Sequence, residues 1–276
     1  MPIYEGAEAD IWIYDIARGT RTRFTFGGGR NARSISDGPC WTPDGKYIVY
    51  ASILYSSPDD KEGTQHLFWK PADGSREAVQ LTRDAYPISF SPDGSVLALH
   101  SFSPETRLDL SLLHLEGIDP YKATPPKPEV WLRTPFIEIF PRFSPDGRWI
   151  AYISDESGRF EVYVRPYRGP GGKVQISANG GLESLWNSNG RELFYFTGTG
   201  WYAVDVTLAP EFRAGKPRLL FEGPFLDIPG FSYDMTPDGQ RFLVHENTEQ
   251  FKAWTTLTVI TNFFDQLPRR VPSAKK

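Results

Sequence analysis

Cysteine is almost missing from this chain of 276 residues, since Cys40 is its only copy. A single cysteine excludes an intramolecular disulfide framework and any cysteine-rich metal site. Strong charge is missing as well. The formal net charge of −4 gives no electrostatic reason to expect DNA, RNA or an anionic membrane as a partner. We therefore expect neither a nucleic-acid partner nor a membrane partner.

Long apolar runs are also missing. No stretch approaches the roughly 20 apolar residues that a membrane-spanning helix needs. Near Met1, the acidic residues Glu5, Glu8 and Asp10 interrupt the apolar segment that a signal peptide would require. These absences predict a soluble protein without a signal peptide, which would be cytoplasmic by default.

Glycine and proline, by contrast, are abundant, with 25 and 24 copies, while 39% of the residues are hydrophobic and 14% are aromatic. So many turn-forming residues beside so much apolar material are typical of many short strands with tight turns rather than of disorder. Aromatic residues favour pleated, half-buried surfaces. The composition therefore predicts an all-β protein.

One turn motif, Pro-Asp-Gly with an apolar strand on either side, organises the whole chain. Four copies contain Pro-Asp-Gly, at Thr42–Gly45, Ser91–Gly94, Ser144–Gly147 and Thr236–Gly239, and a further copy, Asn187–Gly190, reads Asn-Ser-Asn-Gly. In such a turn proline fixes the first corner, Asp can bond its own backbone, and glycine tolerates the exit geometry. The Asp or Asn residues of successive copies are 49, 53, 43 and 49 positions apart. A period of this length combined with strands predicts a β-propeller.

The cleanest repeat predicts one blade of four antiparallel strands. These strands are Pro141–Ser144, Arg148–Ser154, Phe160–Val164 and Lys173–Ser177. The N-terminal unit has only two predicted strands, Asp10–Ile16 and Arg21–Phe26, and the last unit ends at Thr255–Thr261 with no obvious fourth strand. Pairing of the N- and C-terminal strands would complete a shared blade and remove exposed edges. The pattern thus predicts five blades, with six as the alternative if the terminal pieces form separate partial blades.

A large apolar residue stands three positions before the Asp or Asn of every turn. The five are Trp41, Phe90, Phe143, Trp186 and Met235. Such a recurrent bulky residue on the first strand of a blade fits packing between neighbouring blades, so we expect these side chains to be buried. We also expect a single propeller domain over residues 1–267 and a disordered tail over 268–276.

The repeated turn, the segment PRFSPDGRWIAY and the strand DIWIYD resemble the WD40-like (PD40) repeats of TolB-type propellers. The segments FSPDGRWIAYISDESGRFEVYVRPYRGPGGKVQIS, NGRELFYF and GKPRLLFEGPF are similar to the propeller found C-terminal to bacterial serine/threonine kinase domains. Those propellers carry more blades upstream, so the resemblance implies a truncated or free-standing relative. It extends from Asp10 to about Phe264. The chain has neither a kinase motif nor the Gly-x-Ser-x-Gly elbow of the hydrolases that carry similar propellers.

Acidic residues on or near the first strands are the main candidates for a site at the mouth of the propeller channel. They are Asp37, Asp84, Glu138, Glu183 and Asp234. Several carboxylates around one axis could bind calcium, which prefers six to eight oxygen ligands, and Glu183, Asp234 and Glu138 are the residues we assign to such a site. The alternative is that these carboxylates solvate the mouth and cap loops, because they do not share one offset from the turn.

Arg142 and Asp234 do share an offset, four positions before the Asp of their turns. Strand alternation places them on the face opposite the bulky residues, so we expect both to face the channel. There they would either anchor an anionic or polar ligand or form a structural ion pair. The histidines His66, His100, His114 and His245 show no spacing typical of a zinc site.

Two functions remain open on this sequence. The first is a non-catalytic binding or interaction module, similar to the sensor domains of kinases, that holds a protein, peptide or small molecule at the channel mouth. The second is a calcium-dependent lactonase or esterase whose ion polarises a carbonyl group and positions water. The first needs no cofactor and the second needs a calcium ion. The sequence alone does not decide whether the protein is an enzyme.

Overall fold

The computed structural model describes residues 2–5, 8–26, 34–55, 63–122, 127–223, 233–236, 239–244 and 258–259. All 23 regular elements in these residues are β-strands. The predicted all-β class is therefore confirmed. The described part of the chain has no helix that could span a membrane.

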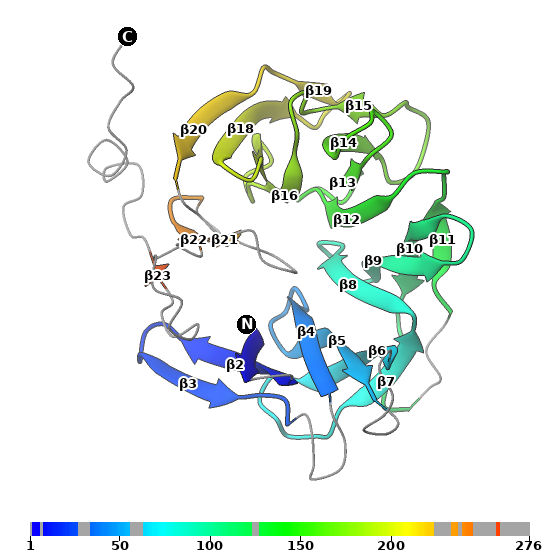
Figure 1. The fold of residues 1–276 in the computed structure, drawn as a ribbon, viewed down its shortest axis with the longest axis vertical. Coiled ribbons are helices and arrows are strands. Elements are labelled where there is room, and N and C mark those ends of the chain that lie inside the picture. The colour runs from blue at the N-terminus through cyan, green and yellow to red at the C-terminus, as the bar shows by residue number, and fades with distance from the viewer. Residues whose placement is uncertain are drawn as a thin grey trace. The chain divides into compact units, whose positions relative to one another are not determined.

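The chain divides into two compact units, Met1–Pro141 and Arg142–Lys276. In the first unit, one sheet has the order β1-β2-β4-β5-β6-β7 with β3 beside β2, and a second sheet has the order β11-β10-β9-β8 (Figure 1). The strands are β1 (Pro2–Glu5), β2 (Glu8–Asp15), β3 (Thr20–Arg23), β4 (Ser34–Trp41), β5 (Tyr47–Leu54), β6 (Thr64–Pro71), β7 (Val79–Arg83), β8 (Ala85–Phe90), β9 (Val96–Ser103), β10 (Arg107–His114) and β11 (Glu129–Leu132).

The second unit contains three further sheets, and the unit boundary falls inside the first strand of the first of them. Their orders are β12-β13-β14-β15, β16-β17-β18-β19 with β20 also beside β18, and β21-β22-β23. The strands are β12 (Glu138–Phe143), β13 (Trp149–Ser154), β14 (Glu161–Pro166), β15 (Val174–Gln175), β16 (Leu182–Trp186), β17 (Glu192–Phe196), β18 (Gly200–Thr207), β19 (Arg213–Ala214), β20 (Arg218–Glu222), β21 (Tyr233–Met235), β22 (Phe242–Val244) and β23 (Thr258–Val259).

In the four fully described copies, the repeated turn joins β4 to β5, β8 to β9, β12 to β13 and β16 to β17, as its residues predict. In the copy at Ser91–Gly94, the Ser91 hydroxyl donates to Asp93 Oδ1 at 2.5 Å and the Ser95 amide donates to the same oxygen at 3.0 Å. The Gly94 amide then closes the turn on the Ser91 carbonyl at 2.8 Å. The copies at Thr42 and Ser144 repeat this arrangement. The Asp of the turn therefore has a structural role.

The sequence-predicted strands agree with the observed ones to within a few residues, with two additions. The predictions missed β1, which pairs with β2, and the short β19, which pairs with β18. Most of Thr255–Thr261 and all of residues 268–276 lie outside the described residues. The predicted pairing of the termini, the number of blades, the single domain and the disordered tail therefore stay predictions.

The core lies between successive sheets. In the first unit, Leu67 and Val49 of one sheet pack in one cluster with Phe90 and Leu97 of the next. In the second unit, Trp201 joins a cluster that includes Phe196, Tyr233 and Phe242. Such contacts between sheets explain why both faces of the central strands are apolar.

Three of the predicted bulky residues, Phe90, Phe143 and Trp186, are buried, and Met235 is half-buried. Trp41, however, is 47% exposed, so the prediction that it is buried was wrong. Phe90 packs edge-on against Trp69 of the preceding sheet, at 6.3 Å between ring centroids. Within the first unit the described strands before β4 are only β1 to β3. These strands belong to the same sheet as β4, so among the described residues of the first unit Trp41 has no preceding sheet to pack against.

Side chains of the first strands also link successive sheets by donating hydrogen bonds to backbone carbonyls. These bonds run from Cys40 to Ile88 (3.6 Å), from Ser89 to Pro141 (2.9 Å), from Trp186 to Arg142 (3.0 Å) and from Tyr233 to Glu183 (2.5 Å). Every acceptor belongs to the first strand of the neighbouring sheet.

Candidate functional site

A β-bulge distorts the first strand of several sheets. The pairing register shifts between Asp37 and Cys40 in β4, between Pro87 and Ser89 in β8, and between Leu182 and Leu185 in β16. Gly38, Phe140 and Glu183, each six positions before the Asp or Asn of its turn, have positive φ angles of 58°, 56° and 45°. A bulge changes the direction of side chains, and strained non-glycine backbone clusters at functional sites. Nothing in the sequence indicated these bulges.

In the second unit, three of the predicted site residues act electrostatically on one buried tyrosine. Tyr233 is 4% exposed, and its hydroxyl donates to the Glu183 carbonyl at 2.5 Å. Burial, and then the negative charges of Glu183 and Asp234, raise the pKa of Tyr233 well above its usual value, while Arg142 opposes this shift. Glu183, Arg142 and Asp234 therefore lie within electrostatic reach of one phenol. We call Arg142, Glu183, Tyr233 and Asp234 the charged cluster.

The members of the charged cluster differ in how far they are exposed to solvent. Glu183 is 3% exposed, Arg142 is half-buried and Asp234 is exposed. Trp201 forms its floor, because its ring meets the Tyr233 ring edge-on at 4.0 Å between centroids. Next to Glu183, the Ser184 hydroxyl is buried and has no hydrogen-bond partner among the described residues. Because Glu183 and the Ser184 hydroxyl are buried, Arg142 and Asp234 are the charged members of the cluster that a ligand could reach.

The first unit contains the other three candidates, and two of them accept a hydrogen bond from a nearby residue. Asp37 is half-buried and accepts a hydrogen bond from the Gly38 amide at 2.6 Å. Glu138 is 1% exposed and accepts one from the Thr134 hydroxyl. Asp84 is exposed, with a positive φ of 54°. That these acids share a common channel stays a prediction.

Among the described residues, no group of three or more His, Cys, Asp and Glu side chains could hold a metal ion. If calcium binds at Glu183 and Asp234, the remaining oxygen ligands must come from other groups. The calcium site therefore stays a prediction.

A second cluster, which sequence reasoning missed, lies in the first unit. The Tyr86 ring of β8 stacks on the His100 ring of β9 with 5.1 Å between centroids and 12° between planes. Phe140 meets His100 edge-on at 5.9 Å. At Gly38 an added Cβ atom would lie 2.4 Å from Tyr86 Cζ, so only glycine leaves room for that ring. We call Gly38, Tyr86, His100 and Phe140 the neutral corner.

Other buried charged groups hold the outer strands in place. In three sheets, an acidic residue near the start of the third strand of the repeat bonds to a side chain just after the fourth strand. Asp10 bonds Thr25 at 2.8 Å, Asp109 bonds Arg133 at 2.6 Å and Glu161 bonds Ser177. His66 occupies the same place in its sheet and bonds Gln80 at 3.0 Å. Because these acids all have partners within their own sheets, we interpret them as structural.

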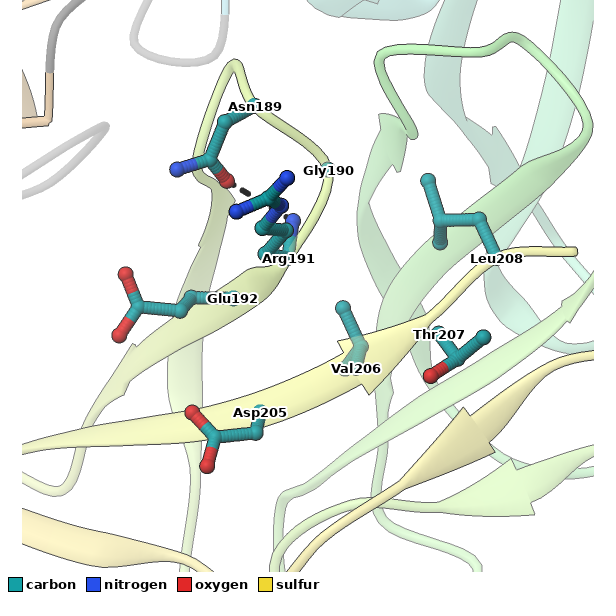
Figure 2. Close-up of a pocket in the computed structure, with 8 residues that line it drawn as sticks. All are labelled: Asn189, Gly190, Arg191, Glu192, Asp205, Val206, Thr207 and Leu208. Atoms are coloured by element: carbon teal, nitrogen blue, oxygen red, sulfur yellow. Dashed lines mark hydrogen bonds between the residues drawn. The ribbon is translucent and has the colours of Figure 1, made fainter.

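An open pocket of 660 Å³ lies beside the fourth repeated turn (Figure 2). Its lining residues are Asn189, Gly190, Arg191, Glu192, Asp205, Val206, Thr207 and Leu208. Glu192 and Asp205 are direct partners across β17 and β18, and Glu192 already pairs with Arg218 and with Asn187. None of the six predicted site residues lines this pocket, so its charged residues are suitable controls for the charged cluster.

Comparisons with known proteins support the fold. No family model matches the chain. A probable dipeptidyl-peptidase 5 of Aspergillus clavatus is 25% identical over 138 residues, which are 45% of this chain but only 19% of that protein.

Two solved structures resemble the chain over most of its length. TolB from Acinetobacter baumannii has a TM-score of 0.64 at 18% identity and covers 87% of this chain and 54% of its own. An oligogalacturonate lyase in complex with manganese has a TM-score of 0.56 at 13% identity and covers 85% of this chain and 67% of its own. Identities this low show the fold alone. The kinase-linked part of the resemblance stays a prediction. The chain has an all-β propeller fold similar to that of TolB.

Proposed function

We propose that the protein is a non-catalytic binding module and that its charged cluster holds a peptide or small molecule bearing charges of both signs. The observations that carry this proposal are the Tyr233–Glu183 hydrogen bond, the exposed Asp234 next to Tyr233 in β21, and the effect of the Arg142 charge on the pKa of Tyr233. Arg142 would bind an anionic group of the ligand, and Asp234, the exposed carboxylate, would bind a cationic group.

The strained backbone supports a binding role for Glu183. A non-glycine residue with a φ of 45° costs about 1–3 kcal/mol and persists only where the surroundings hold it. Tyr233 provides this support, because its hydroxyl bonds the Glu183 carbonyl. The cluster is thereby organised before any ligand arrives, which reduces the entropy lost on binding.

The protonation and hydrogen bonding of Tyr233 support a non-catalytic role. Its raised pKa keeps the phenol protonated at neutral pH, and its proton is already committed to a backbone carbonyl. It is therefore neither a general base nor a nucleophile. The sequence also lacks the Gly-x-Ser-x-Gly elbow that would supply a nucleophilic serine.

A calorimetric titration with trialanine tests the binding role. Trialanine has free termini, and its N-acetylated and C-amidated forms each lack one charge. We expect the free peptide to bind most tightly, Arg142→Ala to abolish the preference for a free carboxylate, and Asp234→Asn to abolish the preference for a free amine. Arg191→Ala and Asp205→Asn, in the pocket of Figure 2, are the matched controls and should bind like the wild type. Equal affinity for all three peptides, or no binding, would contradict the proposal.

The hydrolase is the competing outcome. A screen of lactones and aryl esters, with calcium and with chelator, should show no turnover. Calcium should also leave the melting temperature unchanged, whereas a specific site would stabilise the fold by about 2.7 kcal/mol at a hundredfold its dissociation constant. Calcium-dependent turnover that is lost in Glu183→Gln and in Asp234→Asn would replace the binding module with the hydrolase.

A further inference from the structure

The fourth repeated turn holds its central side chain less firmly than three other copies do. In those copies a hydroxyl at the first position of the turn donates a hydrogen bond to the Asp, and the hydroxyls belong to Thr42, Ser91 and Ser144. The fourth copy has Asn187 at that position, and its side-chain amide donates to Glu192 at 3.0 Å instead. Asn189 Oδ1 therefore accepts one hydrogen bond among the described residues, from the Arg191 amide at 2.8 Å.

The side chain of Asn189 is also open to solvent. Asn189 is exposed, and its side-chain nitrogen makes no hydrogen bond among the described residues. Gly190 follows it, and glycine has no Cβ atom to hinder the approach of its own nitrogen to the preceding side chain. The Gly190 amide donates to the Asn187 carbonyl, a neutral acceptor, at 2.8 Å. The backbone nitrogen of Gly190 can therefore attack the side chain of Asn189 once this bond opens.

Such an attack is a balanced reaction that needs only water. The Gly190 nitrogen loses its proton and forms a bond to Asn189 Cγ, the bond from Cγ to the side-chain nitrogen breaks, and that nitrogen leaves as ammonia. Water then opens the resulting cyclic imide at either carbonyl and leaves an aspartate or an isoaspartate. The surroundings can help or hinder the loss of the amide proton, because a neighbouring negative charge opposes it.

The second Asn-Gly pair of the chain, Asn179-Gly180, lies in different surroundings. The Gly180 amide donates to Oε1 of Glu161 at 2.9 Å, and Glu161 is 1% exposed. A carboxylate accepts a stronger hydrogen bond than a neutral carbonyl does, and its charge opposes the loss of the amide proton. Asn179 is exposed, as Asn189 is. The two pairs therefore differ in the acceptor that holds the attacking nitrogen rather than in their access to water.

We propose that Asn189 is a site of spontaneous deamidation in the folded protein and that the fold protects Asn179 from the same reaction. The new carboxylate would line the pocket of Figure 2 together with Glu192 and Asp205. The pocket would thus become more negative as the protein ages, without the action of an enzyme. The site shares no residue with the charged cluster and is independent of the function proposed for it.

Peptide mass spectrometry of the folded protein, aged in mildly alkaline buffer, tests this inference. The acid should form about tenfold faster at Asn189 than at Asn179, because a hydrogen bond to a charged group is worth more than one to a neutral group. In urea-unfolded protein the two sites should react at similar rates, because the contact with Glu161 is lost. Ion-exchange chromatography follows the same change, with Asn189→Asp as the reference for the aspartate product.

Two variants separate the contributions of the side chain and of the acceptor. Asn189→Gln has a longer side chain that must close a larger ring, so it should keep its amide and leave the rate at Asn179 unchanged. Glu161→Gln keeps a polar acceptor for the Gly180 amide but removes the charge, and it should raise the rate at Asn179 without changing the rate at Asn189.

Three results would overturn the inference. They are an Asn189 amide that stays intact in the folded protein after the unfolded protein has reacted, equal rates at both positions in the folded state, and a faster reaction at Asn179. A thermal melt shows whether Glu161→Gln folds, and the comparison of folded with urea-unfolded wild type needs no variant.

Discussion

The neutral corner and the charged cluster use the same backbone device for opposite chemistry. In each, a residue with positive φ stands six positions before the Asp or Asn of its turn, and a tyrosine from the next sheet covers it. Tyr86 lies against Gly38 in the first unit, and Tyr233 bonds the Glu183 carbonyl in the second. Where the residue is glycine, an aromatic ring fills the space. Where it is glutamate, the same position holds a buried charge.

The comparison shows that the repeat determines the backbone of a site but not its chemistry. One side chain at an equivalent position decides whether the corner is neutral or charged. Four substitutions can break or sharpen this contrast, and they follow from the largest expected effect to the smallest.

Trp201→Ala should remove the floor of the charged cluster. Trp201 is 1% exposed and packs on Tyr233, so we expect a loss of about 3–5 kcal/mol in the free energy of unfolding. Trp41→Ala is the control, because Trp41 is 47% exposed and should cost less than about 1 kcal/mol. Urea unfolding of both variants measures the difference. If both variants lost the same free energy of unfolding, Trp201 would not be a core residue of the second unit.

Gly38→Ala should damage the neutral corner. The new Cβ atom would overlap the Tyr86 ring, in addition to the strain of a positive φ. Gly19→Ala has a similar φ of 65° but open space around it, and therefore isolates the overlap. We expect Gly38→Ala to cost about 1–3 kcal/mol more than Gly19→Ala, as overpacking does. If equilibrium unfolding gives equal losses, Tyr86 can move aside and the corner is not tightly packed.

Tyr233→Phe should remove one hydrogen bond from the charged cluster while it keeps the buried aromatic ring. The change removes one hydroxyl and leaves the Glu183 carbonyl without this donor, at a cost of about 1–2 kcal/mol. Tyr14→Phe, at a tyrosine that is 43% exposed, should be close to neutral. Chemical denaturation gives both values. A Tyr233→Phe protein as stable as the wild type would show that Glu183 keeps its backbone without the tyrosine.

The turns offer the smallest effect, and it depends on pH. The Ser91 hydroxyl, followed by the Ser95 amide, lowers the pKa of Asp93 below its ordinary 3.8. The stability that Asp93 contributes is therefore present above the unfolded pKa of 3.8 and is lost as the pH falls through the lower folded pKa.

Asp93→Asn should thus reduce the drop in stability between about pH 5 and about pH 2. The fourth turn carries Asn189, whose side chain already accepts the Arg191 amide at 2.8 Å, so Asn189→Asp should enlarge that drop. Melting temperatures across this range measure both. An unchanged acid limb in Asp93→Asn would show that other carboxylates dominate it.

The sequence predicted the repeat well because a similar turn marks every copy, with Pro-Asp-Gly in four copies and Asn-Ser-Asn-Gly in the one at Asn187–Gly190. Pro-Asp-Gly and the bulky residue three positions earlier located the strands, and burial of Phe90, Phe143 and Trp186 confirmed their direction. Trp41 failed because burial depends on the preceding sheet, which local sequence does not describe. The charges of Arg142, Glu183 and Asp234 were visible as residue types at first strands, and the structure places all three near Tyr233.

The neutral corner and the bulges could not be predicted in the same way. His100 is one of four scattered histidines, and its pairing with Tyr86 depends on the register of β8 against β9. A bulge adds a residue without a characteristic sequence, so Glu183 gave no signal of its positive φ. The structural role of the buried acids Asp10, Asp109 and Glu161 could not be predicted either, because each bonds to a residue that follows a different strand.

The hydrogen bonds between first strands affect which substitutions such a chain can tolerate. Every acceptor is a backbone carbonyl, which any residue supplies, while the donors are as different as Cys40, Ser89, Trp186 and Tyr233. Substitution at an acceptor position therefore preserves the link, and several residue types can replace the donor. A lineage built this way can lose its sequence signature while its architecture persists.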